Sequence, residues 1–417
     1  MIMMCSGLSH AQRQTLSLGS VSESMSTHFA PCGFPTHNDE WDTSDSTLTE
    51  CHTVVVSGCP NSHDVNNPVP PLTAFVAVNH QPAGTTSAGT IVLLDGDGGT
   101  NFLRAGNGTN QYVVDYYTTS PHFTTVQVAW ADDWDDNTNP SATVKSVKDE
   151  ACRPATLLKY INDNYAVSST GAMCAQGHSG GASAIAYAME FYGADRAASG
   201  GYLDTVVMTS GPTLADIYNG CHYAGSGSQA PASSVCHGGV CFGAAQEWSA
   251  CLEHPMSGHA DCFTDSPENY PTGGLYVTAR AVAMHTIDLN ANCNDWQGTH
   301  ASTTGDDDNA WLDMSLVPVP YGHYPQTFMY GFLCHGRDTV NGEDYSNSSA
   351  AQGWSYLSKL QVSSGQNGGF PQIYRVNGCG DPEMIWKPTS DAVGSGQHGY
   401  EASRDAMRNN CNTLHRE

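Results

Sequence analysis

The chain has 417 residues, of which 39% are hydrophobic and 9% aromatic, so it can build a packed core and is not disordered as a whole. Asp and Glu number 41 against 15 Lys and Arg, and the net charge of -26 excludes nucleic acid and anionic membranes as partners. Because no apolar run approaches the roughly 20 residues that cross a bilayer, we also expect no membrane span.

Residues 1–45 are rich in Ser, Thr, His and Asp without a clear period, and we interpret them as a loosely ordered lead-in to a single folded domain, 46–417. From there, short apolar runs that end at turn residues predict six strands, at 53–56, 74–78, 90–94, 125–130, 172–176 and 204–208. The first two are expected to be antiparallel. Apolar residues that recur every three or four positions predict an amphipathic helix over 147–165.

Residues 211–320 interrupt this rhythm, because they are rich in Cys, His, Gly and Ser and show no strand or helix period. We interpret them as a cap inserted after the sixth strand. The alternation then resumes with a strand at 326–333, a helix at 348–360, a strand at 372–376 and a helix at 401–414. Strands that alternate with helices predict an α/β fold with a mostly parallel central sheet flanked by helices.

The most informative motif is Gly-His-Ser-Gly-Gly-Ala at 177–182, between a predicted strand and a helix over 183–192. A strand-to-helix turn this tight strains the backbone at the serine and leaves room only for small residues two positions before and after it. The turn exposes the serine hydroxyl at the carboxyl end of the sheet, beside a helix amino terminus that favours negative charge. We therefore predict that Ser179 is a nucleophile.

A glycine-rich segment, Leu-Asp-Gly-Asp-Gly-Gly-Thr at 94–100, follows the predicted strand at 90–94. The oxyanion that forms during acyl transfer needs preorganised backbone donors, and glycines allow the main chain to approach a substrate closely. We expect Gly98 or Gly99 to supply one N–H and Gly180 the other.

A nucleophilic serine needs a histidine base, and the base needs an acid that orients it. Asp338 follows the strand after the cap and is our first choice for the acid, with Asp344 and Asp381 as alternatives. His398 is the one histidine between the last predicted strand and the closing helix, and we predict that it is the base. The alternative, His415, lies too near the terminus.

With these elements in this order, the chain from about residue 50 onward resembles the α/β-hydrolase superfamily, including bacterial secreted members without an assigned substrate. The resemblance implies an α/β-hydrolase fold and hydrolysis of carboxylic esters by a triad of Ser179, Asp338 and His398 through an acyl-enzyme. The segment 95–99 departs from the His-Gly-Gly-Gly of lipases and esterases, so Gly98 and Gly99 both remain candidate donors. We expect no cofactor.

The fifteen cysteines fit an oxidising compartment, so we expect a secreted protein with disulfides, although residues 1–20 lack the apolar core of a signal peptide. Because the number of cysteines is odd, at least one thiol must stay outside any intramolecular disulfide, and Cys5 is our candidate for it. Cysteines and histidines between 236 and 262 could ligate zinc, but their spacing favours disulfides, and the acidic run 305–309 lacks the spacing of an EF-hand. We predict no metal site.

The substrate is expected to be a small or polymeric ester, polyesters included. Two alternatives stay open: a peptidase or lipase that uses the same triad, and a non-catalytic binding protein on the same fold. A missing triad member would favour the non-catalytic alternative. This sequence, however, offers a candidate for the serine, the histidine and the acid.

Overall fold

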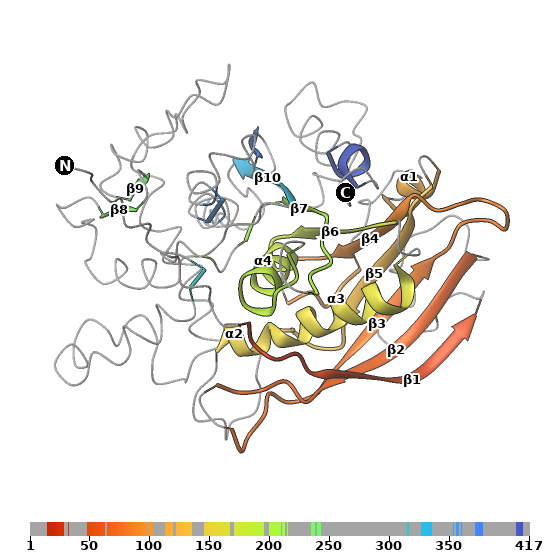
Figure 1. The fold of residues 1–417 in the computed structure, drawn as a ribbon, viewed down its shortest axis with the longest axis horizontal. Coiled ribbons are helices and arrows are strands. Elements are labelled where there is room, and N and C mark those ends of the chain that lie inside the picture. The colour runs from red at the N-terminus through yellow and green to blue at the C-terminus, as the bar shows by residue number, and fades with distance from the viewer. Residues whose placement is uncertain are drawn as a thin grey trace, which may run out of the picture.

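The structure is a computed structural model. It describes residues 15–28, 32, 48–62, 65–96, 98–102, 113–119, 122–135, 146–166, 171–195, 200–209, 211, 212, 215, 235–237, 240–242, 315, 316, 327–335, 353, 356, 357, 360, 372–377 and 406–411. Within these residues, nine strands form one twisted sheet (Figure 1). Their order across the sheet is β1 (Ser20–His28), β2 (Thr49–Ser57), β3 (Leu72–Asn79), β5 (Thr124–Trp130), β4 (Gly89–Leu94), β6 (Ala172–His178), β7 (Thr205–Thr209), β10 (Phe328–His335) and β11 (Gln372–Asn377).

The sheet is antiparallel at one end and parallel through the rest. Strands β1, β2, β3 and β5 pair antiparallel, whereas β5, β4, β6, β7, β10 and β11 pair parallel. This arrangement confirms the mostly parallel sheet predicted from the sequence and the antiparallel pairing of 53–56 with 74–78.

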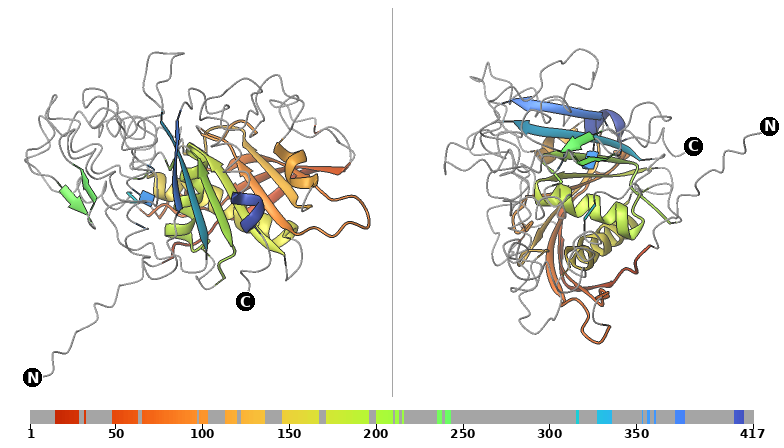
Figure 2. Two further views of the ribbon diagram at one scale, coloured as in Figure 1. Left: turned by 90° about the horizontal axis from the view of Figure 1, so that it is seen from above. Right: turned by 90° about the vertical axis from the view of Figure 1, so that its left-hand side faces the viewer.

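Helices cover both faces of the sheet, because the strands alternate their side chains between two apolar cores. On β4, Val92 and Leu94 face a core that includes α3 (Cys152–Tyr165) and α4 (Gly180–Tyr192). Ile91 and Leu93 face a second core with α1 (Val113–Thr119) and Met407, which belongs to a short helix at 406–410. Figure 2 shows this last helix on the face opposite α3 and α4. The expectation of a sheet flanked by helices is therefore correct.

The helices that follow β4 and β6 leave the carboxyl ends of these two strands toward opposite faces of the sheet. These two strands are neighbours, yet the helix that follows β4 covers one face and the helix that follows β6 covers the other. In open α/β sheets, ligands bind where successive connections leave the sheet in opposite directions. The fold thus places the segments that follow Leu94 and His178 at the position where a binding site is expected.

The lead-in predicted for 1–45 is wrong for its central part. β1 pairs along its length with β2, from Ser20 opposite Ser57 to His28 opposite Glu50, and the preceding Gly19 donates its N–H to Thr156 Oγ1 on α3. The strand lies at the edge of the sheet and is mostly polar, so it lacks the apolar period on which the prediction rested. Strand β1 is therefore held in the sheet by its backbone pairing with β2 more than by burial of its side chains.

Other elements also differ from the sequence expectations. The expected helix over 147–165 consists of α2 (Val147–Glu150) and α3, and α1 was not predicted. Inside the region interpreted as a cap, β8 (Val235–His237) and β9 (Val240–Phe242) form a two-stranded antiparallel sheet where no strand was expected. Most of 211–320 lies outside the described residues, so the cap remains a prediction.

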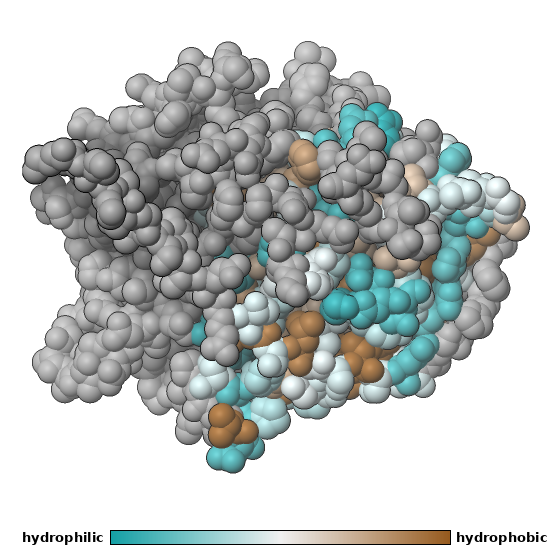
Figure 3. Space-filling model, viewed as in Figure 1, coloured by the Kyte–Doolittle hydropathy of each residue, from teal (hydrophilic) through white to brown (hydrophobic). Residues whose placement is uncertain are grey.

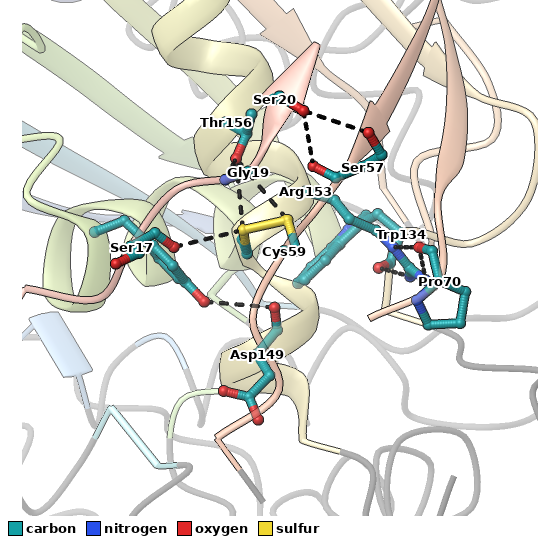
Figure 4. Close-up of a disulfide and its surroundings, with 12 residues drawn as sticks. Ser17, Gly19, Ser20, Ser57, Cys59, Pro70, Trp134, Asp149, Arg153 and Thr156 are labelled. Atoms are coloured by element: carbon teal, nitrogen blue, oxygen red, sulfur yellow. Dashed lines mark hydrogen bonds between the residues drawn. A yellow bond between two sulfur atoms is a disulfide. The ribbon is translucent and has the colours of Figure 1, made fainter. Parts of the chain in front are cut away.

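Three disulfides connect distant parts of the described chain: Cys32–Cys51, Cys59–Cys152 and Cys174–Cys411. Cys59–Cys152 joins the end of β2 to the start of α3 (Figure 4), and Cys174–Cys411 joins β6 to the residue after the 406–410 helix. Buried disulfides agree with the oxidising compartment expected from the cysteine content. Cys5 lies outside the described residues.

The described surface offers little apolar area. On the face drawn in Figure 3, hydrophobic residues form separate small patches among polar ones, and Val65 is the one exposed large hydrophobic side chain that the described residues contain. In the same part of the chain, no helix has the length and hydrophobicity needed to cross a membrane.

Candidate active site

Ser179 occupies the turn between the last residue of β6 and the first residue of α4. Its φ of 49° and ψ of -111° are rare for a residue with a side chain and store backbone strain. Two backbone hydrogen bonds hold the turn: the Ser179 N–H donates to the Thr209 carbonyl at 2.8 Å, and the Ser183 N–H donates to the Ser179 carbonyl at 3.1 Å. The sequence motif therefore forms the strained turn that it predicts.

The glycines on either side of Ser179 are required by contact. A Cβ on Gly177 would lie 2.5 Å from the carbonyl carbon of Gly181 and 2.6 Å from the nitrogen of Ala182. A Cβ on Gly181 would lie 2.5 Å from the Leu94 carbonyl oxygen and 2.6 Å from that of Asp95. Since all of these are backbone atoms that cannot rotate away, the requirement for small residues is confirmed at both positions.

The fold exposes Ser179 while it buries its neighbours. Every residue from 171 to 189 is buried except Ser179, which is partly exposed. It lies at the carboxyl end of β6, and α4 begins at Gly180, so the amino terminus of this helix lies beside it. This end of a helix stabilises nearby negative charge.

The glycine-rich segment after β4 packs directly against this turn. A Cβ on Gly96 would lie 3.1 Å from the Cβ of Ser179 and 2.9 Å from Cδ2 of His178. Gly96 is thus a loop residue with no room for a side chain beside the candidate nucleophile, and the sequence motif did not single it out. Its position two residues after β4, the strand adjacent to β6, is the signal that could have identified it.

Gly98 and Gly99 lie farther along the same segment. The Gly99 N–H donates to the Gly96 carbonyl at 2.9 Å, and Gly99 has a φ of +74°, which favours glycine. The Trp130 N–H donates to the Gly99 carbonyl at 2.8 Å, and the Trp134 N–H donates to the Gly98 carbonyl at 2.9 Å. The segment is therefore fixed by backbone hydrogen bonds from the end of β5 and the turn that follows it.

The strand order, the strained serine after β6 and the glycine segment after β4 together decide the fold. The chain has the α/β-hydrolase fold. Each of these features belongs to the described part of this chain and depends on no likeness to another protein.

Solved structures similar to this chain include several esterases. A bacterial heroin esterase is 10% identical with a TM-score of 0.40, over 87% of this chain and 84% of that one. Brefeldin A esterase, a bacterial homologue of human hormone sensitive lipase, is 14% identical (TM-score 0.40; 92% and 80% covered). A hyperthermophilic esterase from the archaeon Pyrobaculum calidifontis is 13% identical (TM-score 0.40; 89% and 86% covered). No protein-family model and no curated protein matches the sequence.

The other two members of the predicted triad, Asp338 and His398, lie outside the described residues, as do Asp344, Asp381 and His415. The topology places the strands that precede them. β10 runs parallel beside β7, which runs parallel beside β6, and β11 runs parallel beside β10. These strands therefore end at the same edge of the sheet as Ser179, and the positions of the acid and the base remain predictions.

His178 supports the turn and is not suited to act as a base. Its ring is fully buried, and this burial lowers its pKa from 6.5 to about 4. The Thr209 hydroxyl donates to the Gly177 carbonyl at 3.2 Å, so its oxygen accepts from Nδ1 of His178, also at 3.2 Å. His178 is thus neutral near pH 7 and carries its proton on Nδ1.

The lowered pKa of His178 predicts a loss of stability in acid. Between pH 6.5 and about pH 4 the unfolded chain binds a proton on this imidazole and the folded chain does not, so the free energy of unfolding falls by about 3 kcal/mol on acidification. The H178N variant keeps a donor but does not titrate. Urea denaturation of the wild type and H178N from pH 7.5 to 4 measures this effect. The difference between their free energies of unfolding should change by about 3 kcal/mol over this range. If both free energies change with pH in the same way, the lowered pKa of His178 is contradicted.

Among the described residues, no group of three or more His, Cys, Asp or Glu side chains could hold a metal ion. The side chains considered for zinc between 236 and 262, and the acidic run 305–309, are not described.

Proposed function

We propose that this chain is a secreted serine hydrolase that cleaves carboxylic esters. The observation that carries the proposal is the strained, partly exposed Ser179 at the amino terminus of α4, between neighbours that are all buried. Backbone strain in a folded protein persists where the surrounding structure maintains it, and it clusters at active sites. The three buried disulfides support secretion into an oxidising compartment.

In the proposed reaction, Ser179 Oγ attacks the ester carbonyl carbon while its proton passes to His398. Asp338 orients the imidazole and stabilises its charged form. The tetrahedral intermediate collapses, the alcohol leaves with the proton from His398, and the acyl group stays on Ser179. Water then attacks the acyl-enzyme as His398 takes its proton, and the acid is released as that proton returns to Ser179.

The oxyanion of both tetrahedral intermediates requires two backbone donors. Gly180 is the first residue of α4, so its N–H has no partner within the helix and is the first proposed donor. The second belongs to the segment after β4. Gly99 already donates its N–H to the Gly96 carbonyl, so Gly98 is the preferred choice of the two predicted glycines. Gly96 is a further candidate donor because it lies beside Ser179.

The substrate class is proposed to be a small or polymeric ester, with polyesters among the polymers to be tested. Acyl and alcohol preference would be determined by residues around the mouth of the site, including the predicted cap. A panel of short p-nitrophenyl esters, triglycerides, peptides and an insoluble polyester film distinguishes an esterase from a lipase or peptidase.

Active-site labelling tests the proposal. A fluorophosphonate probe should react with the folded protein in a one-to-one ratio and abolish turnover of p-nitrophenyl acetate, because the nucleophile is consumed. Tandem mass spectrometry of the reduced digest should locate the adduct on Ser179. An adduct on another residue would refute the assignment of the nucleophile, and an unlabelled, inert protein would favour a non-catalytic binding protein.

A further inference from the structure

A buried arginine lies beneath the glycine segment, on the first turn of α3. The side chain of Arg153 is 2% exposed, and its guanidinium donates from Nη1 to the Trp134 carbonyl at 2.9 Å. It also donates to the Pro70 carbonyl, from Nη2 at 2.9 Å and from Nε at 3.2 Å (Figure 4). A guanidinium holds its donors in one rigid plane, so Arg153 fixes the distance between these two loops.

Trp134 connects this arginine to the segment after β4. Its carbonyl accepts from Arg153, and its N–H donates to the Gly98 carbonyl at 2.9 Å. The side chain of Trp134 is itself buried, so the residue has no freedom to follow a displaced loop. A chain of two hydrogen bonds through one buried residue thus joins Arg153 to Gly98.

The glycine segment depends on this support for its position. A Cβ on Gly98 would overlap the carboxyl group of Asp133, and a Cβ on Gly99 would lie 3.0 Å from Cδ1 of Trp130 and 3.4 Å from Cδ1 of Trp134. The two glycines therefore pack directly on residues 130–134. Movement of residues 133 and 134 would move the backbone of Gly98 with them.

Arg153 is itself held at a fixed point of the fold. The preceding residue, Cys152, forms a disulfide with Cys59, and Thr156 on the next turn accepts a hydrogen bond from the Gly19 N–H at 2.9 Å. Figure 4 shows these contacts on the same turns of α3 as Arg153. Helix α3 thus anchors the arginine to the β1–β2 end of the sheet.

We infer that Arg153 is a positioning residue for the oxyanion site and acts on it through Trp134 and Gly98. The inference rests on the proposed function, since it assigns Arg153 a part in ester hydrolysis. Loss of one oxyanion donor lowers kcat by about 10² to 10³-fold, and a misplacement of about 1 Å can cost about 10²-fold. Because the oxyanion forms after the substrate binds, the effect falls on kcat and leaves KM nearly unchanged.

The R153K variant keeps the charge but loses the planar set of donors, so we expect its kcat for p-nitrophenyl acetate to fall about 10 to 100-fold, with KM within about threefold of wild type. R153Q removes the charge, keeps an amide donor, and serves as a second variant in case the lysine prevents folding. Y202F is the matched control, because Tyr202 donates a buried hydrogen bond from its hydroxyl to the Ala155 carbonyl on α3. Tyr202 precedes β7, whereas the glycine segment follows the carboxyl end of β4.

Circular dichroism and urea denaturation of all three variants separate positioning from stability. The inference is supported if a folded Arg153 variant loses kcat while Y202F, similarly destabilised, keeps it. It is overturned if a folded Arg153 variant keeps the wild-type kcat, if Y202F loses as much, or if neither Arg153 variant folds, since the residue would then serve stability alone. If the wild-type protein shows no turnover that depends on Ser179, the proposed function itself fails.

Discussion

Replacement of Ser179 with alanine is expected to lower kcat for short p-nitrophenyl esters by about 10⁵-fold or more. The variant cannot form an acyl-enzyme, so only the oxyanion donors and substrate binding would still accelerate hydrolysis. The fold should tolerate the change, because the side chain is partly exposed and alanine keeps the Ser179 Cβ that lies beside Gly96. Steady-state kinetics together with thermal unfolding measure both quantities.

The matched control is S183A. Ser183 is a second serine close to this turn, buried on the first turn of α4, with its hydroxyl 3.5 Å from the Ser179 carbonyl. The proposed mechanism assigns it no role, so S183A should keep turnover and labelling by the fluorophosphonate. Retained turnover in S179A, or its loss in S183A alone, would mean that another serine is the nucleophile.

The G181A variant should lose most of its activity for a steric reason. Alanine favours helix over glycine by about 1 kcal/mol, which on its own would stabilise α4. The new methyl group, however, would lie 2.5 Å from the Leu94 carbonyl oxygen, and the backbone of β4 cannot yield, so the turn must move away from the glycine segment. We expect kcat to fall about 100-fold and the free energy of unfolding to fall by about 1 to 3 kcal/mol.

G84A controls for the general effect of adding a methyl group to a glycine. Gly84 has a φ of +89°, and among the described residues no atom would lie within 4 Å of a Cβ placed there. Its substitution should therefore cost about 1 to 2 kcal/mol of backbone strain and leave kcat unchanged. Kinetics and urea denaturation of both variants decide the question. Wild-type kcat in G181A would show that the turn can relax without a loss of function.

The sequence correctly predicted the elements whose residues show a local pattern, above all the buried strands of the parallel part of the sheet. The strands predicted at 90–94 and 172–176 are buried on both faces and therefore consist mostly of apolar residues, as parallel strands usually do. β1 was missed, because an edge strand with one neighbour carries little burial and so no apolar period. α1 was missed as well, since seven residues are too few to establish a helical repeat.

Within the candidate site, the sequence by itself determined the turn around Ser179, because the glycines at 177 and 181 and the neighbouring strand and helix are consecutive in the chain. The roles of Gly96, Trp134 and Arg153 were decided only by the tertiary structure. These residues meet because β4 lies between β5 and β6 and because α3 packs beneath the turn after β5. Such contacts join segments far apart in sequence, and no local period or motif encodes which segments become neighbours.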